Sequence, residues 1–214
     1  MKQLKDKHQG FTLTEMAIVI VLGGILLTAG LMAGRGQISR AQAQDVIQIA
    51  GDLQTAASSF KQRYGYLPGD WVFATATLPN ILVGGTGGTL GNGLITGTLA
   101  AATGLATAGT EIAVAPNQLY QAGLIGKLGT NPAMFLQSQF GAVHMASSDA
   151  TNATAAYATA NPAVQNVIVF FKLPCEVVIE VDRALDNGDT NTGKVMTDVA
   201  CTAGGVAART FVPL

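Results

Sequence analysis

An apolar segment dominates the start of the chain. From Phe11 to Gly34 nearly every residue is hydrophobic or small, and Glu15 is the only charged one. A helix of about 20 apolar residues is long enough to cross the hydrocarbon layer of a membrane. The segment before it, residues 1–10, contains three lysines and one aspartate. Because positive charge tends to stay in the cytoplasm, the pattern predicts a membrane helix with its N-terminus inside and the rest of the chain outside.

Beyond Arg35 the apolar residues recur at intervals of three and four, which is the period of an amphipathic helix. The pattern continues to Tyr64, where Gly65 and then Pro68 supply a stop signal. We therefore predict one long helix from about Thr12 to Tyr64. Its first half would lie in lipid or in the core of an assembly, and its second half would pack on a folded domain.

The remainder of the chain has a glycine-rich connection followed by short regular elements. A short helix is predicted to open near Pro116 and to close at Gly123. Residues 173–185 fit either a strand or a helix, since valine and isoleucine alternate there but proline and glycine bracket the segment. The other segments are a connection at 73–115, strands at 139–145, 167–172, 194–201 and 207–212, and a polar, alanine-rich excursion at 147–162.

Glu15 needs an explanation, because a carboxylate within a lipid-facing helix is energetically costly. An ordinary secretory signal has a shorter apolar region that is followed by its cleavage site. Here the apolar region is longer, and the candidate processing residue, Gly10, precedes it. An uncleaved signal anchor is the alternative, but it leaves the acid unexplained. A buried carboxylate requires a cationic partner, and a newly cut α-amino group in the same apolar bundle would supply one.

The residues around Gly10 resemble the N-terminal signal of type IV pilins and type II secretion pseudopilins. The similarity rests on Gly10, Phe11 and Glu15, followed by the apolar run. It implies cleavage after Gly10 by a prepilin peptidase and N-methylation of Phe11. It also implies that Glu15 pairs with the N-terminal amine of a neighbouring subunit during filament assembly. Thr14 and the absence of proline at 31–33 depart from the common pattern, which leaves major pilin, minor pilin and pseudopilin open.

The resemblance also implies a fold and a division of the chain. The expected fold is α+β and type IV pilin-like, with the long helix packed on an antiparallel β-sheet. Residues 1–10 would be a leader, 11–35 the transmembrane or filament-core half of the helix, and 36–214 the periplasmic or extracellular globular domain. The segment 66–71 is similar to a turn in a pilin-like subgroup, and that subgroup favours a helix at 173–185.

Cys175 and Cys201 both fall in the part that is predicted to be exported. An even number of cysteines in an oxidising compartment favours one disulfide. Closing the loop between them would contribute roughly 3 kcal/mol in the loop-entropy model. Two unrelated buried thiols are the alternative. Pilins commonly enclose a C-terminal loop with such a pair, so the resemblance supports the disulfide.

Asp182, Asp186, Asp189 and Asn191 cluster around Gly188. Calcium binds six to eight oxygen atoms and is often held by acidic loops. Pseudopilins hold calcium in a C-terminal loop, so the resemblance makes these residues candidate ligands. Their spacing does not match an EF-hand, and Asp-Asn-Gly also forms ordinary turns. Calcium is therefore one interpretation of the cluster, and no other cofactor is expected.

The sequence lacks the patterns of an enzyme or of a nucleic-acid-binding protein. Its histidines are His8 and His144, and no nucleophile elbow accompanies His144, which is interpreted as a strand residue. Two cysteines 26 positions apart do not provide a zinc-site spacing. A net charge of −1, with 12% charged residues, gives no basic surface for nucleic acid.

The predicted function is that of a structural subunit in a type IV pilus or a similar filament, serving adhesion, motility, DNA uptake or secretion. Its partners would be copies of itself, the prepilin peptidase, the inner-membrane assembly machinery and the membrane. The chain would span the inner membrane once before assembly and lie in a periplasmic or extracellular filament afterwards. A type II secretion pseudopilin and a membrane-anchored binding or enzyme domain that never polymerises are the alternatives.

Overall fold

The computed structural model describes residues 11–71, 89 and 91–214. The predicted leader with Gly10 and most of the first half of the predicted connection at 73–115 lie outside the described residues. The chain forms two compact units, Met1–Arg40 and Ala41–Leu214. The division falls within one long helix. Each unit is described separately below.

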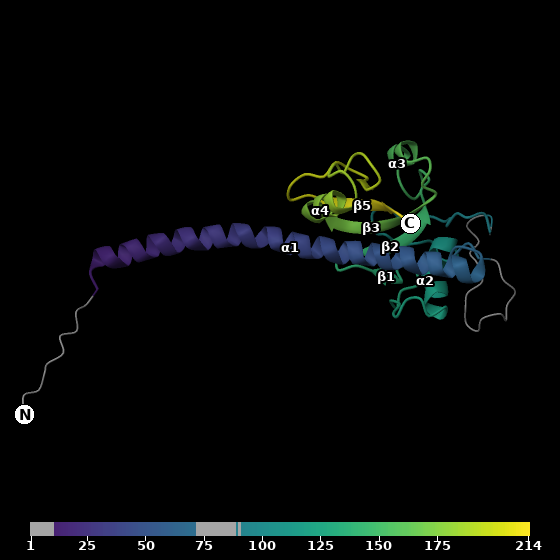
Figure 1. The fold of residues 1–214 in the computed structure, drawn as a ribbon, viewed down its shortest axis with the longest axis horizontal. Helices are drawn as coiled ribbons and strands as arrows, with labels where there is room; N and C mark the ends of the chain where they lie inside the picture. Colours follow the sequence, from purple (N-terminus) through teal and green to yellow (C-terminus); the bar gives the residue numbers. More distant parts are fainter. Residues whose placement is uncertain (1–10, 72–88, 90) are drawn as a thin grey trace, which may run out of the picture. The chain divides into compact units, whose positions relative to one another are not determined.

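Helix α1 extends from Leu13 to Tyr64, which confirms the predicted helix to within one residue (Figure 1). It ends where the sequence indicates, because Gly65 adopts a left-handed φ of +85° and donates its N–H to the Lys61 carbonyl oxygen at 2.8 Å. Glycine takes this conformation without steric cost, and it is the usual residue just beyond a helix.

The second half of α1 buries one face in the core of the larger unit. The buried side chains recur at three and four positions, as the helical period requires. They belong to the same hydrophobic cluster as the residues of the β-sheet, and Figure 1 shows this part of α1 running beside the strands. The buried residues are Ala43, Val46, Ala50, Leu53, Ala56, Ala57 and Phe60.

The sheet confirms the predicted α+β class. Within the described residues it has five strands in the order β1-β2-β3-β5-β4, and every pairing is antiparallel. The central strand β3 is almost completely buried, since it pairs on both sides and is covered on both faces. The strands are β1 (Leu136–Gln137), β2 (Ala142–Ser147), β3 (Asn166–Pro174), β4 (Met196–Thr197) and β5 (Val206–Pro213).

Several strand boundaries differ from the predicted ones. Strand β2 begins three residues late because Ser138 and Gly141 form a turn, in which the Ser138 N–H donates to the Gly141 carbonyl oxygen at 2.8 Å. Of the predicted strand 194–201 only Met196–Thr197 pairs, because Asp186 accepts the N–H groups of the residues just before it. The two-residue strand β1 was not predicted, since a strand of this length is too short to show an alternating pattern in the sequence.

The helices outside α1 show one confirmed prediction, one wrong boundary and one omission. Helix α4 (Cys175–Leu185) confirms the helical interpretation of residues 173–185. Helix α2 (Glu111–Gln121) begins five residues before the predicted start, so Pro116 lies inside it. Helix α3 (Ala155–Ala160) lies in the segment that was predicted as an irregular excursion, and its N-cap Thr154 accepts the Tyr157 N–H at 3.1 Å.

The early start of α2 has a tertiary cause. The buried Glu111 side chain accepts hydrogen bonds from the Thr96 N–H at 2.6 Å and the Thr96 hydroxyl at 2.7 Å. This contact fixes the first turn of the helix against a segment far upstream. The Gly69 turn then packs on it: a Cβ atom on Gly69, whose φ is +91°, would lie 2.5 Å from the Glu111 carbonyl oxygen. Glycine is therefore required at the predicted Pro68-Gly69 turn for its conformation and for space.

Candidate functional site

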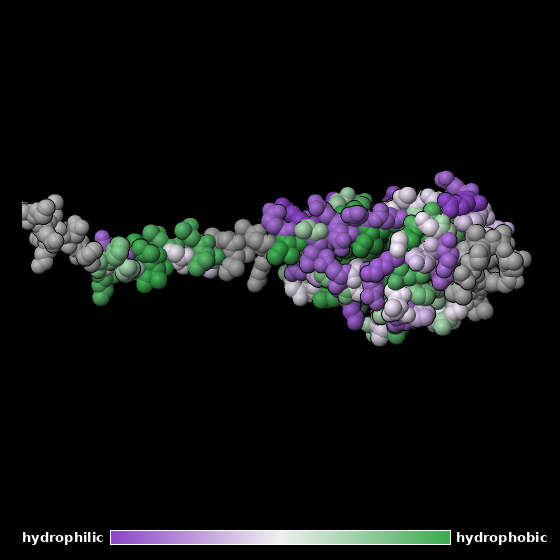
Figure 2. All heavy atoms as spheres, turned by 90° about the horizontal axis from the view of Figure 1, so that it is seen from below, coloured by the Kyte–Doolittle hydropathy of each residue, from purple (hydrophilic) through white to green (hydrophobic). Residues whose placement is uncertain are grey.

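The first part of α1 presents hydrophobic side chains without cover in the single chain. Phe11 is 79% exposed and Leu13 is 86% exposed, and the apolar residues that follow them are also exposed. Figure 2 shows these hydrophobic residues gathered along this part of the helix. None of the helices in the described parts of the chain combines the length and the apolar character needed to cross a membrane. The other exposed residues are Met16, Ile18, Val19, Ile20, Val21, Leu22, Ile25, Leu26 and Leu27.

Glu15 closes the N-terminus of α1 by a reciprocal capping contact. Its Oε2 accepts hydrogen bonds from the Thr12 N–H at 2.8 Å and the Thr12 hydroxyl at 2.7 Å. In return, the Glu15 N–H donates to the Thr12 hydroxyl oxygen at 3.3 Å. This is a capping box, in which residues three apart satisfy each other's free backbone groups. The spacing Thr-x-x-Glu before an apolar run was a sequence signal for it that our sequence reasoning missed.

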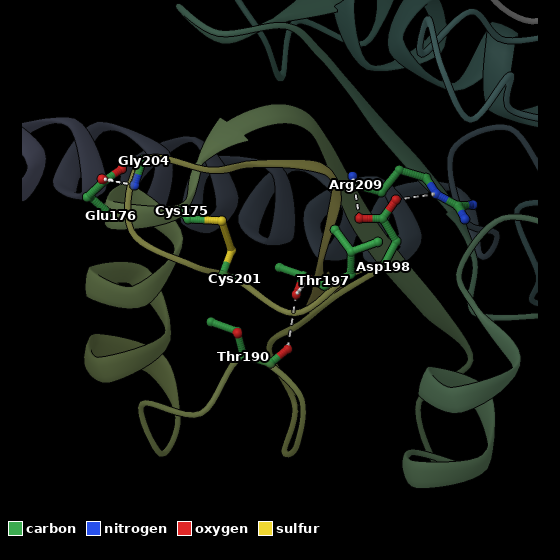
Figure 3. Close-up of a disulfide and its surroundings, with 9 residues drawn as sticks. Cys175, Glu176, Thr190, Thr197, Asp198, Cys201, Gly204 and Arg209 are labelled. Carbon is green, nitrogen blue, oxygen red and sulfur yellow. Dashed lines mark hydrogen bonds and ion pairs between the residues drawn. A yellow bond between two sulfur atoms is a disulfide. The ribbon is translucent and has the colours of Figure 1, made fainter.

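Cys175 and Cys201 form a disulfide, which confirms the predicted pair. It joins the first residue of α4 to the segment between β4 and β5 (Figure 3). Two hydrogen bonds support the same junction: the Cys175 N–H donates to the Gly205 carbonyl oxygen at 2.9 Å, and the Gly204 N–H donates to the Glu176 carboxylate at 2.7 Å. The disulfide therefore fixes a contact between elements that are distant in sequence.

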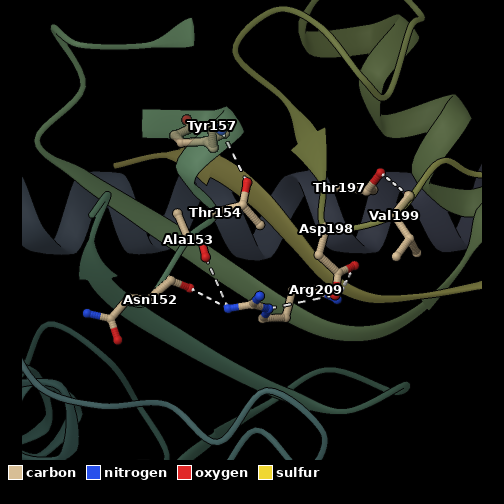
Figure 4. A network of polar contacts seen from close by, with 8 residues as sticks. All are labelled: Asn152, Ala153, Thr154, Tyr157, Thr197, Asp198, Val199 and Arg209. Carbon is tan, nitrogen blue, oxygen red and sulfur yellow. Dashed lines mark hydrogen bonds and ion pairs between the residues drawn. The ribbon is translucent and has the colours of Figure 1, made fainter. Parts of the chain in front are cut away.

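Arg209 on β5 links two further segments, one at residues 152–153 and one at Asp198 (Figure 4). Its guanidinium group donates to the carbonyl oxygens of Asn152 and Ala153 at 3.2 and 3.1 Å. The Nε atom of Arg209 lies 3.7 Å from the Asp198 carboxylate, and the backbone N–H of Arg209 donates to the same carboxylate at 3.1 Å. The group also lies over the Phe211 ring, 5.6 Å from its centre. Nothing in the sequence identifies Arg209, because its hydrogen-bond and ion-pair partners come from segments outside β5.

The four acidic and amide residues proposed as calcium ligands have different environments. Asp182 is buried, and the Gly188 backbone N–H is the group that stabilises its charged carboxylate. Burial, and next the neighbouring Asp186, raise the pKa of Asp182 to about 6. The Asp186 carboxylate accepts the N–H groups of Lys194 and Val195.

Asp189 and Asn191 belong to the turn itself. The Asp189 carboxylate accepts the Asn191 N–H at 3.1 Å and the Asn191 side-chain amide at 3.2 Å. Among the described residues, no three Asp, Glu, His or Cys side chains lie close enough together to hold one metal ion. Calcium binding at this loop stays a prediction.

His144 lies in β2, as the sequence indicated, and is only 1% exposed. Its Nε2 lies 2.7 Å from the Gly104 carbonyl oxygen, and its ring meets the Phe171 ring edge to face at 6.0 Å. Burial lowers the pKa of His144, because the charged imidazolium loses its hydration there. The residue therefore serves the core as a neutral ring.

We expect the stability of the protein to fall on acidification partly because of His144. A lowered folded-state pKa means that the unfolded chain binds the proton more tightly, so the stabilising contribution is complete above pH 6.5 and is lost as the pH falls below it. Urea unfolding of the wild type and of His144→Gln at pH 7.5 and pH 5.0 measures this. The variant should lose less free energy of unfolding on acidification, by on the order of 1 kcal/mol. An equal loss in both proteins would contradict the assignment.

Comparison with known proteins identifies the N-terminal segment. Residues 5–31 match the model of the prokaryotic N-terminal methylation motif. The chain is similar to the fimbrial protein EcpC of Eikenella corrodens, with 36% identity over 102 residues that cover 45% of this chain and 65% of the relative. It is also similar to a fimbrial protein of Moraxella nonliquefaciens, with 39% identity over 57 residues that cover 27% of this chain and 37% of the relative.

The chain thus spans less than two thirds of the length of both fimbrial relatives, and no solved structure matches it significantly. The motif and the two names are consistent with the type IV pilin family, and the long helix with an antiparallel sheet is consistent with a pilin-like fold. Fimbrial proteins are structural, which agrees with the prediction that this chain is not an enzyme.

Proposed function

We propose that this chain, which carries the N-terminal methylation motif, is a structural subunit of a type IV pilus or of a similar filament, and that it polymerises through α1. The observation that carries the proposal is the uncovered apolar segment at residues 11–28, which leads into and forms the first part of α1 and has a single acid near its start. Exposed apolar surface of this extent is stabilised by burial against lipid or against other apolar helices, at about 25 cal/mol per Å².

The proposed sequence of events begins with the chain in the inner membrane as a single-pass protein. Prepilin peptidase would cut after Gly10, and the new N-terminus at Phe11 would be methylated. Inner-membrane assembly machinery would then transfer the helix from lipid into a bundle of copies. In that bundle Glu15 would pair with the α-amino group of a neighbouring Phe11. The capping box shows that the Glu15 carboxylate already points toward the start of its helix, where that amine would arrive.

The processing step is tested by replacing Gly10 with leucine. A bulky residue before the cut should block the peptidase, so the protein isolated from cells should keep residues 1–10. Intact-mass spectrometry would then show a precursor in Gly10→Leu and a methylated N-terminus at Phe11 in the wild type. Gln9→Leu, the matched control one position away, should be cut normally. A wild-type protein that begins at Met1 would overturn the proposed processing.

A further inference from the structure

Lys172 has an unusual backbone conformation for its residue type. Its φ is +59°, and among the described residues it is the one non-glycine residue with a positive φ. It lies within β3, where the pairing with β5 keeps the same register on both sides, at Phe171↔Arg209 and Leu173↔Ala207. Glycine takes a left-handed conformation without strain, whereas an L-residue with a side chain is destabilised by it. A lysine in this position therefore points to a role for its side chain.

The Lys172 side chain borders a surface hollow of about 250 Å³. Two lining residues, Met134 and Phe140, are apolar and pack partly buried against the core. Two others, Gln137 and Gln139, are exposed amides. Within the described part of the chain, neither glutamine side chain nor Lys172 forms a side-chain hydrogen bond or an ion pair. The hollow thus combines apolar surface with a cation and two amides that are available to a ligand.

A close backbone contact holds the hollow in shape. A Cβ atom on Gly141 would lie 2.7 Å from the Phe171 carbonyl oxygen, so the turn at 138–141 lies directly against β3 beside Lys172. The Ser138 N–H and hydroxyl both donate to the Gly141 carbonyl oxygen, at 2.8 and 3.2 Å. The lining residues on the turn at 138–141 and on β3 are therefore held in position before any ligand binds, and this lowers the entropic cost of binding.

We propose that this hollow binds an acidic monosaccharide, a uronic acid, with Lys172 donating to its carboxylate. Binding sites of this kind place a few polar groups around apolar surface, and charge-assisted hydrogen bonds supply the strongest contacts. The Gln137 and Gln139 amides would bind ring hydroxyls, and Met134 with Phe140 would contact the apolar face of the ring. The proposal concerns the folded unit alone and does not depend on filament assembly.

The test compares glucuronic acid with glucose by ligand-observed NMR titration of the purified full-length chain in detergent. Glucuronic acid should bind the wild type at least about tenfold more tightly than glucose, as expected for a hydrogen bond to a charged group. Lys172→Ala should lose that preference. Lys61→Ala removes the same charge at an exposed position that lies outside this hollow, and it should keep the preference. Equal binding of the two sugars by the wild type, or an unchanged preference in Lys172→Ala, would overturn the proposal.

Lys172→Gly separates a binding role from a structural one. The substitution relieves the strained φ, so its melting temperature should equal or exceed that of the wild type while the preference for glucuronic acid is lost. A melting temperature several degrees below that of the wild type would assign Lys172 to the stability of β3 and would overturn the proposal.

Discussion

Glu15→Gln should abolish normal filaments while leaving the helix intact. Glutamine preserves the capping box with Thr12, because an amide oxygen accepts the same hydrogen bonds. It removes the negative charge, so the amine of a neighbouring subunit would be buried without its partner. Leaving one charge of a buried pair uncompensated costs about 3–5 kcal/mol, which corresponds to assembly weaker by at least about a hundredfold. Sheared surface material, examined by electron microscopy and immunoblotting, measures the yield of filaments.

Thr12→Val is the matched control for this prediction. It removes the hydroxyl that exchanges hydrogen bonds with Glu15, but it keeps the shape of the side chain and the charge of the acid. Loss of such a cap costs about 1 kcal/mol of helix stability, so filament yield should fall far less than in Glu15→Gln. If Glu15→Gln assembled normally and Thr12→Val did not, Glu15 would act as a helix cap and the proposed charge pair would be wrong.

Removal of the disulfide should produce the largest loss of stability. Replacing both Cys175 and Cys201 with alanine should lower the free energy of unfolding by roughly 3 kcal/mol. The disulfide closes a loop and so restricts the unfolded chain, and without it the unfolded chain regains that conformational entropy. Thermal unfolding of the purified protein, followed by circular dichroism, measures the change. The double substitution avoids a free thiol, which a single replacement would leave behind.

Reductant provides the control for the disulfide. Dithiothreitol should lower the melting temperature of the wild type toward that of the double variant and should leave the variant unchanged. A variant as stable as the oxidised wild type would show that the hydrogen bonds at Gly204 and Gly205 hold the junction without the covalent bond.

The capping box and Arg209 show two different limits of the sequence reasoning. The contact between Thr12 and Glu15 is local, and its spacing is visible in the sequence, but from the sequence the acid was interpreted only through its cost in lipid and its pairing with a neighbouring amine. Arg209 has no such signal. Its partners, Asn152, Ala153 and Asp198, come together only when the strands pair and the excursion before β3 folds over them.

By itself the sequence determined the long helix and its end at Tyr64, because helical periodicity and a glycine stop act within one segment. The α+β class followed from the resemblance to a known family, which also supported the cysteine pair that an even number of cysteines favours. Tertiary structure alone decided the start of α2 at Glu111, the shortness of β4 and the strained φ of Lys172. Each of these depends on a contact or a pairing between segments far apart in the chain, and residue preferences along the sequence do not encode which distant groups will meet.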